Sequence, residues 1–406
     1  MEPSKSLPKS SSLNDKTDSG STLSHLIYNP KVRSFVFQLL TVAVLGYFFY
    51  VIVTNTMTNL NDRGITTGFD FLDRQAGFGI SLSLISYDET YSFGRTFVVG
   101  LLNTVLVSVL GIILATILGF TVGIARLSSN WIVNRLAAVF IEIVRNVPPL
   151  LQILFWYFAV LRALPQARQS LSLGEAIFLN IRGLYIPKPI FEAGSGFIIA
   201  ALILGIIASI GVYIWAKNKQ KVTGKQTPVT RIVLGLCIGL PLVVYFLAGM
   251  PISADYPELK GFNFNGGITI LPELFALWVA LGIFTAAFIA EIVRSGINAV
   301  NHGQTEAAMA LGLPRSKTLK LVIIPQAMRI IVPPLTSEYL NLTKNSSLAM
   351  AIGYPDLVSV FAGTTLNQTG QAIEIIFMTM AVYLALSLFT SWLMNIYNRK
   401  VALVER

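Results

Sequence analysis

Hydrophobic residues fall into eight long runs along this chain, separated by shorter and more polar segments. The runs cover residues 35–57, 97–125, 136–161, 197–215, 232–250, 271–293, 330–350 and 373–398. A run of about 20 apolar residues is long enough to cross a hydrocarbon layer of about 30 Å as an α-helix. The pattern therefore predicts an all-α membrane protein with about eight transmembrane helices.

The distribution of charge orients these predicted spans. With the amino terminus placed in the cytoplasm, the inside segments carry 20 Lys and Arg against 5 acidic residues, and the outside segments carry 8 against 10. Cytoplasmic loops of membrane proteins are enriched in Lys and Arg, so this placement satisfies the positive-inside rule. Both termini are then predicted to be cytoplasmic. The net charge of +10 reflects this orientation and needs no nucleic-acid partner.

Composition excludes several other classes of protein. Only 12% of the residues are charged, whereas a soluble domain has about a quarter. Cys237 is the single cysteine, and His25 and His302 lie far apart, so neither a disulfide framework nor a metal site is expected. No phosphate-binding loop and no nucleophile–base pair can be recognised. We expect a protein that is not an enzyme and binds no cofactor itself.

One polar segment, QTEAAMALGLPRSKTLKLVIIPQ at residues 304–326, has the features of an ordered helical hairpin. Glu306, Ala307 and Ala308 begin a helix-forming stretch, Gly312 can close it in the left-handed conformation, and Pro314 suits the first turn of a second helix. The hairpin would present Glu306 and Arg315 to the cytosol. A plain amphipathic surface hairpin is the alternative interpretation.

The extended pattern of this segment closely resembles the EAA loop of ABC-importer permeases. Val322 and Ile324 are conservative departures from the family's Ile-x-Leu-Pro ending. By this resemblance the loop is the element that docks on a cytosolic ATPase. The ATPase-coupling residues would be Glu306, Ala307, Ala308, Gly312 and Arg315.

Further stretches resemble the polar amino acid permeases of the histidine and glutamate type, in the long-form general amino acid subfamily. These are EIVRNVPPLLQ (142–152), AEIVRSGI (290–297), GQTEAAMALGLPRS (303–316), PQAMRIIVPPL (325–335) and KNSSLAMAIG (344–353). The chain departs from many relatives at Asn146-Val147, where they have Gly-Thr. It departs again at Asn345-Ser346, where they have Asp-Thr, so a possible acid is absent.

The resemblance implies a type I permease core of five spans with additions. The expected parts are a flexible cytoplasmic tail (1–34), an extra span (35–57), an extracytoplasmic segment (58–96), the first part of the core (97–161), a two-span insertion (162–270), the second part of the core (271–398) with the coupling loop at 295–325, and a cytoplasmic end (399–406).

The tetrapeptide Glu-Ile-Val-Arg occurs twice, with Glu142 and Arg145 in one copy and Glu291 and Arg294 in the other. Residues three apart share a helix face, so each acid can pair with its own base. Pairing makes charges tolerable at membrane depth. We interpret both copies as candidate structural ion pairs, with a functional role as the alternative.

The span at 330–350 is the least apolar one, and its polar residues share a face. An amino acid needs a cation or amide donors for its carboxylate and acceptors for its ammonium group. The candidate substrate-pathway residues are Glu338, Asn341, Lys344 and Asn345 on this span, with Asn103, Gln152 and Thr285 as neighbours. A polar network that merely joins helices is the alternative.

These features together lead us to expect the permease subunit of an ATP-driven importer of polar amino acids in the bacterial inner membrane. Its range would be broad and include neutral or acidic and amide-bearing amino acids. The expected partners are a cytosolic ATPase dimer that binds ATP and Mg²⁺, a second permease, and an extracytoplasmic amino acid-binding protein. The long insertions favour a heterodimer of permeases over a homodimer. A secondary transporter driven by an ion gradient and a membrane scaffold are the rival interpretations.

The two transport hypotheses predict different energy sources. We expect amino acid uptake through this protein to stop when cells are depleted of ATP, because the predicted hairpin couples to an ATPase. Uptake of a labelled amino acid would be measured after ATP depletion and, separately, after treatment with an ionophore. Uptake that survives ATP depletion but collapses with the ionophore would favour the secondary transporter.

Overall fold

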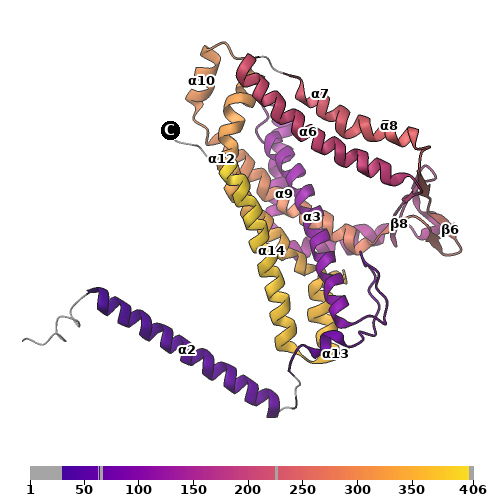
Figure 1. The fold of residues 1–406 in the computed structure, drawn as a ribbon, viewed down its shortest axis with the longest axis vertical. Coiled ribbons are helices and arrows are strands. Elements are labelled where there is room, and N and C mark those ends of the chain that lie inside the picture. The colour runs from indigo at the N-terminus through magenta and orange to yellow at the C-terminus, as the bar shows by residue number, and fades with distance from the viewer. Residues whose placement is uncertain (1–29, 63, 65–66, 225–226, 402–406) are drawn as a thin grey trace, which may run out of the picture. The chain divides into compact units, whose positions relative to one another are not determined.

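The computed structural model describes residues 30–62, 64, 67–224 and 227–401 (Figure 1). The chain separates into two units, residues 1–68 and 69–406. In the first unit, the described part is one helix, α2 (Pro30–Asp62). Its side chains are apolar over most of its length, and its residues 30–59 are long enough to cross a membrane. The predicted tail at residues 1–34 lies almost wholly outside the described residues.

The second unit is built around a bundle of helices, most of them long. Its main members are α3 (Phe93–Ala125), α4 (Trp131–Asn146), α5 (Pro149–Leu154), α9 (Pro272–Asn298), α12 (Ile324–Asn345) and α14 (Ala372–Val401). Over the described residues of both units, seven helices are long and apolar enough to span a membrane, and α4 with α5 adds an eighth if it counts as one broken span. The prediction of a helical membrane protein with about eight spans is confirmed.

Close packing of α3 against α9 forms the centre of this bundle. Gly119 lies over Ile289 and Gly123 over Val293, while Gly282 of α9 lies over Leu114, so the two helices run parallel. A methyl group added at Gly119 would lie 2.6 Å from the Ile289 side chain. Lipid offers helices little hydrophobic driving force for association, so small residues that let backbones approach closely are what hold such pairs together.

The predicted span 136–161 is not one straight helix. It breaks between α4 and α5, whose axes differ in direction by 106°. Pro148 removes a backbone donor there, and the Gln152 Nε2 atom donates to the carbonyl oxygens of Val144 (2.8 Å) and Val147 (2.9 Å). The freed carbonyls at the break are thus satisfied inside the protein, as the membrane interior requires. The π-helical turn η2 (Phe155–Val160) and the short 3₁₀ helix η3 (Leu161–Ala163) continue α5.

The insertion contains the two expected spans and also a set of short strands. Its helices are α6 (Ser195–Thr223), α7 (Val229–Leu234), the π-helical η5 (Gly235–Gly239) and α8 (Leu240–Leu247). The strands are β1 (Leu171–Leu173), β2 (Ile177–Asn180), β3 (Gly183–Ile186), β4 (Lys188–Phe191), β5 (Ile252–Asp255), β6 (Glu258–Lys260), β7 (Asn263–Asn265) and β8 (Ile268–Ile270).

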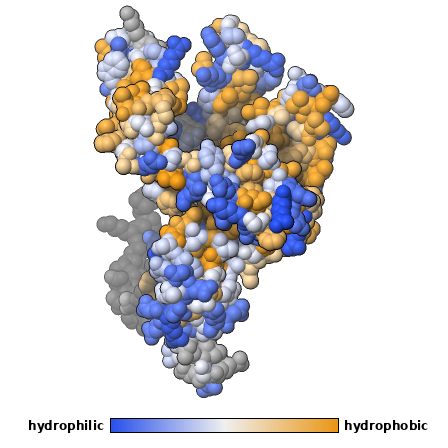
Figure 2. Space-filling view, turned by 90° about the vertical axis from the view of Figure 1, so that its right-hand side faces the viewer, coloured by the Kyte–Doolittle hydropathy of each residue, from blue (hydrophilic) through white to orange (hydrophobic). Residues whose placement is uncertain are grey.

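All strand pairs are antiparallel, and they form one sheet of order β1-β2-β3-β8 and the two-stranded sheets β4-β5 and β6-β7. The pairing of Tyr185 with Thr269 joins the two ends of the insertion beside the start of α9. Strands of three or four residues leave little local pattern, so the sequence did not predict them. On the side of the protein that Figure 2 shows, hydrophobic side chains cover broad areas and hydrophilic patches lie among them.

The remaining elements are short. They are the helices α10 (His302–Ala310), α11 (Arg315–Thr318) and α13 (Leu366–Thr369), the π-helical segments η6 (Leu319–Ile323) and η8 (Val358–Thr365), and the 3₁₀ segments η1 (Asp70–Asp73), η4 (Ala167–Gln169) and η7 (Ser346–Ile352). In Figure 1, α10 and α13 lie at opposite ends of the bundle. The buried apolar core follows α3, α9 and α12 through the bundle's length.

The α3–α9 contact should be intolerant of even one added methyl group. We expect Gly119→Ala to destabilise the protein by about 1–3 kcal/mol, because the new group meets the Ile289 side chain and must push the helices apart. The measurement is the thermal unfolding midpoint in mild detergent.

Gly211→Ala is the matched control for this substitution. Gly211 also lies within a membrane-spanning helix, α6, but no atom lies within 4 Å of the position that its Cβ would take. The control should keep the wild-type midpoint. Equal midpoints for the two variants would show that the close approach of α3 and α9 is not limiting for stability.

Candidate functional site

The segment predicted to form a helical hairpin does so. Asn301 caps α10 by accepting a hydrogen bond from the Gly303 backbone N–H (2.8 Å). Gly312 ends this arm with φ +77°, a left-handed conformation that side-chain-bearing residues rarely adopt. Pro314 then caps α11. The second arm continues without interruption through η6 into α12.

The two arms of the hairpin are held against each other. Ala308 (4% exposed) and Thr318 (2% exposed) are buried between them. The Leu313 backbone N–H donates to the Ala308 carbonyl oxygen (3.1 Å). The Gln326 Nε2 atom of α12 donates to the Gln304 Oε1 atom of α10 (3.2 Å). These contacts make the hairpin an ordered extension of α12.

The predicted coupling residues divide into two groups. Glu306, Ala307, Gly312 and Arg315 are exposed. Ala308 is buried within the hairpin, so its side chain is not part of the exposed surface, and its role in coupling stays a prediction. Its small side chain lets α10 lie close to η6 instead. The Oε1 atom of Glu306 lies 3.0 Å from the Nδ1 atom of His302, one helical turn away, so the carboxylate and the imidazole ring contact each other.

Sequence reasoning missed two apolar residues at the hairpin tip. Met309 is 51% exposed and Leu311 is 82% exposed. Together with the exposed side chains of Glu306 and Arg315, they form what we call the tip surface. Their position in the sequence could have revealed them. Both lie on a different side of the helix from buried Ala308, at the end of a short helix where polar residues are expected.

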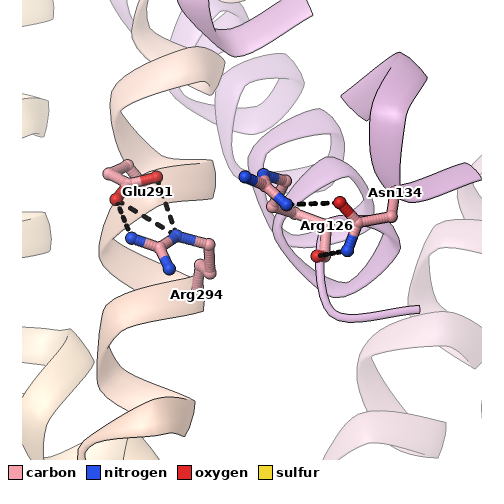
Figure 3. Close-up of polar contacts among 4 residues, drawn as sticks. All are labelled: Arg126, Asn134, Glu291 and Arg294. Atoms are coloured by element: carbon pink, nitrogen blue, oxygen red, sulfur yellow. Dashed lines mark hydrogen bonds and ion pairs between the residues drawn. The ribbon is translucent and has the colours of Figure 1, made fainter. Parts of the chain in front are cut away.

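The two Glu-Ile-Val-Arg copies behave differently. Arg294 Nε donates to both carboxylate oxygens of Glu291 at 3.1 Å, so the second pair forms as predicted (Figure 3). In the first copy, Glu142 and Arg145 are both exposed, and no ion pair joins them in the part of the chain that the structure describes. Arg145 lies over the Phe288 ring of α9 at 5.0 Å instead. That predicted pair is wrong, because packing on an aromatic face competes with it.

The Arg145 guanidinium connects the two copies in space. It interacts electrostatically with Glu291 of α9 and with Glu338 of α12. Arg126, at the end of α3, also interacts electrostatically with Glu291, and its guanidinium donates a hydrogen bond to the Asn134 side chain of α4 (Figure 3). Charges from four helices therefore converge at one end of the bundle. Beside them, a cavity of about 300 Å³ lies between α9 and α12 and is lined in part by Glu291 and Pro334.

The structure does not bring the seven predicted pathway residues together. Glu338 and Asn345 are half-buried and Asn341 and Lys344 are exposed, and all four lie on α12. Exposed Pro333, Pro334 and Ser337 extend the same side of the helix. This side, which we call the α12 polar face, is not covered by the described residues of this chain.

The other three predicted pathway residues are buried inside the bundle. Gln152 holds the break between α4 and α5, and Thr285 is 2% exposed within α9. The Asn103 Nδ2 atom donates to the carbonyl oxygens of Leu82 (2.8 Å) and Pro355 (2.9 Å). Asn103 and Gln152 therefore bind the protein's own backbone, which makes them architectural rather than available to a ligand in this conformation.

Asp356 is a fully buried carboxyl group that sequence reasoning missed. Its Oδ1 atom accepts from the Ser359 backbone N–H (2.9 Å) and its Oδ2 atom from the Tyr383 hydroxyl (3.3 Å). Burial raises the pKa of Asp356 to about 7, because desolvation disfavours the charged form. Asp356 follows Pro355, whose carbonyl oxygen accepts a hydrogen bond from Asn103 of α3, and Tyr383 belongs to α14. The segment between η7 and η8 therefore contacts both α3 and α14 here.

Comparison with known proteins places these features in context. Residues 228–403 match the family described as "Binding-protein-dependent transport system inner membrane component". The chain is 57% identical to the putative amino-acid ABC transporter permease protein YhdX of Escherichia coli (strain K12), over 93% of this chain and 96% of that protein. It is 50% identical to the general L-amino acid transport system permease protein AapQ of Rhizobium johnstonii, over 94% and 95%.

A third relative is the glutamate/glutamine/aspartate/asparagine transport system permease protein BztB of Rhodobacter capsulatus. It is 40% identical over 97% of this chain and 99% of its own length. Among solved structures, a crystal structure of an amino acid ABC transporter with histidines aligns with a TM-score of 0.44 at 20% identity. That alignment covers 76% of this chain and 95% of the other.

The buried carboxyl group of Asp356 should make stability depend on pH. Its pKa in the folded state lies above the ordinary value of 3.8, so the folded protein holds a proton that the unfolded chain releases between about pH 4 and pH 7. Stability should therefore fall as pH rises through this window, by at most about 1.4 kcal/mol per pH unit.

Asp356→Asn should remove this pH dependence, and the control Asp73→Asn, at an exposed carboxyl group, should keep it. The measurement is the thermal unfolding midpoint in detergent at pH 5.5 and pH 8 for the three proteins. Parallel pH profiles for the wild type and Asp356→Asn would contradict the assignment.

Proposed function

The chain belongs to the binding-protein-dependent transport system inner membrane component family, as an amino-acid ABC transporter permease, and from this premise we propose how its parts serve import. It is a multi-pass inner-membrane transport subunit rather than an enzyme, and in this family separate subunits hydrolyse ATP. We propose that it carries polar amino acids over a broad range. The names of its relatives AapQ, a permease for general L-amino acids, and BztB, a permease for glutamate, glutamine, aspartate and asparagine, support that range.

The observation that carries the coupling proposal is the hairpin formed by α10 and α11. Its tip surface combines an exposed acid, an exposed base and two exposed apolar side chains, Met309 and Leu311. A side chain that is 82% exposed, such as Leu311, gains free energy when a partner covers it. We therefore assign the tip surface to contact with the ATPase, which would bind ATP and Mg²⁺.

The hairpin is also built to transmit movement. Its second arm is continuous with α12, and the Gln304–Gln326 hydrogen bond ties its first arm to the same helix. A displacement at Glu306 or Leu311 is therefore passed to α12 as a rigid body rather than lost in a mobile loop. Closure of the two ATPase subunits would then switch the permease between inward-open and outward-open states.

The exposure of the α12 polar face supports the proposal that a second permease subunit binds there. Lys344 and Asn341 are exposed at membrane depth on this face, and a charged side chain left against lipid is costly. A partner that covers the face would place these groups, with Glu338, along a pathway between the two subunits. A lysine and an amide can bind a carboxylate, and a glutamate can bind an ammonium group, so the face suits an amino acid. We favour a distinct permease as the partner.

The orientation follows from charge. The hairpin and both chain termini would be cytoplasmic, because the segments on that side carry the excess of Lys and Arg. The strands of the insertion would then face the extracytoplasmic binding protein that delivers substrate. The ion-gradient alternative has no comparable support, since the relatives are ABC permeases.

The coupling assignment is tested by disrupting the tip surface. We expect Glu306→Lys and Leu311→Glu each to weaken ATPase association by about 2 kcal/mol, roughly thirty-fold, because both would lie in the docked interface. Tagged chain, produced with its transport system, is purified in gentle detergent, and the co-purifying ATPase and second permease are identified and quantified. Substrate-stimulated ATP hydrolysis is measured on the same preparations.

Glu192→Lys and Leu173→Glu are the matched controls. Both residues are exposed, but they lie in the insertion, outside the hairpin. The controls should retain the co-purifying ATPase. If the hairpin variants also retain it, the tip surface is not the coupling site; if no ATPase accompanies the wild type, the importer proposal itself fails.

A further inference from the structure

A second cavity lies where the broken span, the insertion and α9 meet. Its volume is about 320 Å³, enough for a single amino acid. Apolar groups form part of its wall, and four polar or charged side chains complete it. The lining residues are Tyr157, Leu161, Arg162, Ile181, Arg182, Pro272 and Glu273.

Charges of both signs line this cavity without forming ion pairs with each other. Glu273 accepts a hydrogen bond from the Tyr157 hydroxyl (2.8 Å). Arg182 donates to the Phe262 carbonyl oxygen (3.1 Å), and Arg162 lies over the ring of Phe158 at 5.1 Å. Over the part of the chain that the structure describes, no carboxylate oxygen lies within 4.0 Å of either guanidinium. Two arginines and one glutamate therefore line a common space without forming an ion pair, and Tyr157 interacts with both Glu273 and Arg162.

The surrounding structure holds these charges in place. Arg182 sits in the turn between β2 and β3, where its backbone N–H donates to the Oδ1 atom of buried Asn180 (2.8 Å). Gly183 follows with φ +133°, and a Cβ there would lie 2.3 Å from the Ile270 carbonyl oxygen. Only glycine allows this approach to β8, which leads directly to Glu273. The insertion thus positions Arg182 against the first turn of α9.

We propose that this cavity is a receiving site for the zwitterionic end of a free L-amino acid on its way from the binding protein to the membrane pathway. Arg162 and Arg182 bind the α-carboxylate, Glu273 binds the α-ammonium group, and Tyr157 orients Glu273. The side chain of the amino acid points out of the cavity, which fits a transporter of broad range. This proposal rests on the importer function and on the orientation given above.

The chemistry favours a zwitterion over a simple anion. A guanidinium binds a carboxylate strongly through charge-assisted hydrogen bonds. An anion would gain from the two arginines but would be repelled by Glu273 in the same cavity. A ligand with both charges satisfies all three groups at once.

The test uses the complete transporter in lipid nanodiscs, without its binding protein, and L-glutamine as the probe. Two analogues each remove one charge: L-glutamine amide lacks the carboxylate and N-acetyl-L-glutamine lacks the ammonium group. We expect Arg182→Gln and Glu273→Gln each to raise the half-saturating concentration of L-glutamine at least tenfold. Arg182→Gln should favour L-glutamine over its amide less strongly than the wild type does, because Arg162 remains, and Glu273→Gln should no longer distinguish L-glutamine from its N-acetyl derivative.

Arg168→Gln is the matched control, because Arg168 lies in the same insertion but stacks on Phe262 at 4.5 Å and does not line the cavity. It should bind L-glutamine as the wild type does. Co-purification of the ATPase is checked for every variant, so that loss of the assembled importer is distinguished from loss of the site.

Unchanged L-glutamine binding by Arg182→Gln and Glu273→Gln, in complexes that retain the ATPase, would overturn the proposal. If a separate assay with added binding protein then shows that the same variants bind that protein more weakly, the cavity is a contact for the binding protein instead. A wild-type complex that lacks the ATPase would instead contradict the proposed function.

Discussion

The close contact between α3 and α9 is the constraint on which the rest of this structure depends. Three glycines remove side chains where the two helices meet, so their backbones approach closely and their neighbours are fixed in turn. The end of α3 brings Arg126 near Glu291 of α9, and the start of α9 brings Glu273 to the insertion. Both ends of α9 therefore carry a charged site whose geometry is set by packing at its middle.

A second constraint is that polar groups within a membrane need partners. This chain meets the constraint in two ways. Asn103 and Gln152 bond to its own backbone and stabilise irregular segments, such as the break between α4 and α5. The α12 polar face finds no cover within the described residues, and a second subunit is the simplest cover for it. The same residue types thus divide into architectural and functional groups according to what surrounds them.

The proposed functions lie on different parts of one rigid frame. The hairpin continues into α12, so the surface proposed to dock the ATPase and the face proposed to line the pathway belong to one helical element. The insertion adds the charged cavity at the start of α9, which no five-span core could form without Ile181 and Arg182. The proposed coupling surface, pathway face and receiving cavity consequently lie at different positions along one helical bundle and are joined through α9 and α12, although their residues lie far apart in sequence.

The sequence alone determined the membrane class, the approximate spans and the hairpin with its glycine turn. These follow from hydropathy and from local backbone preferences, which act within a few residues. The tertiary structure decided the burial of Ala308, the stacking of Arg145 on Phe288 and the pairing of β3 with β8. Each of these depends on contacts between residues that a local pattern does not relate, so packing alone could select among the alternatives that the sequence allowed.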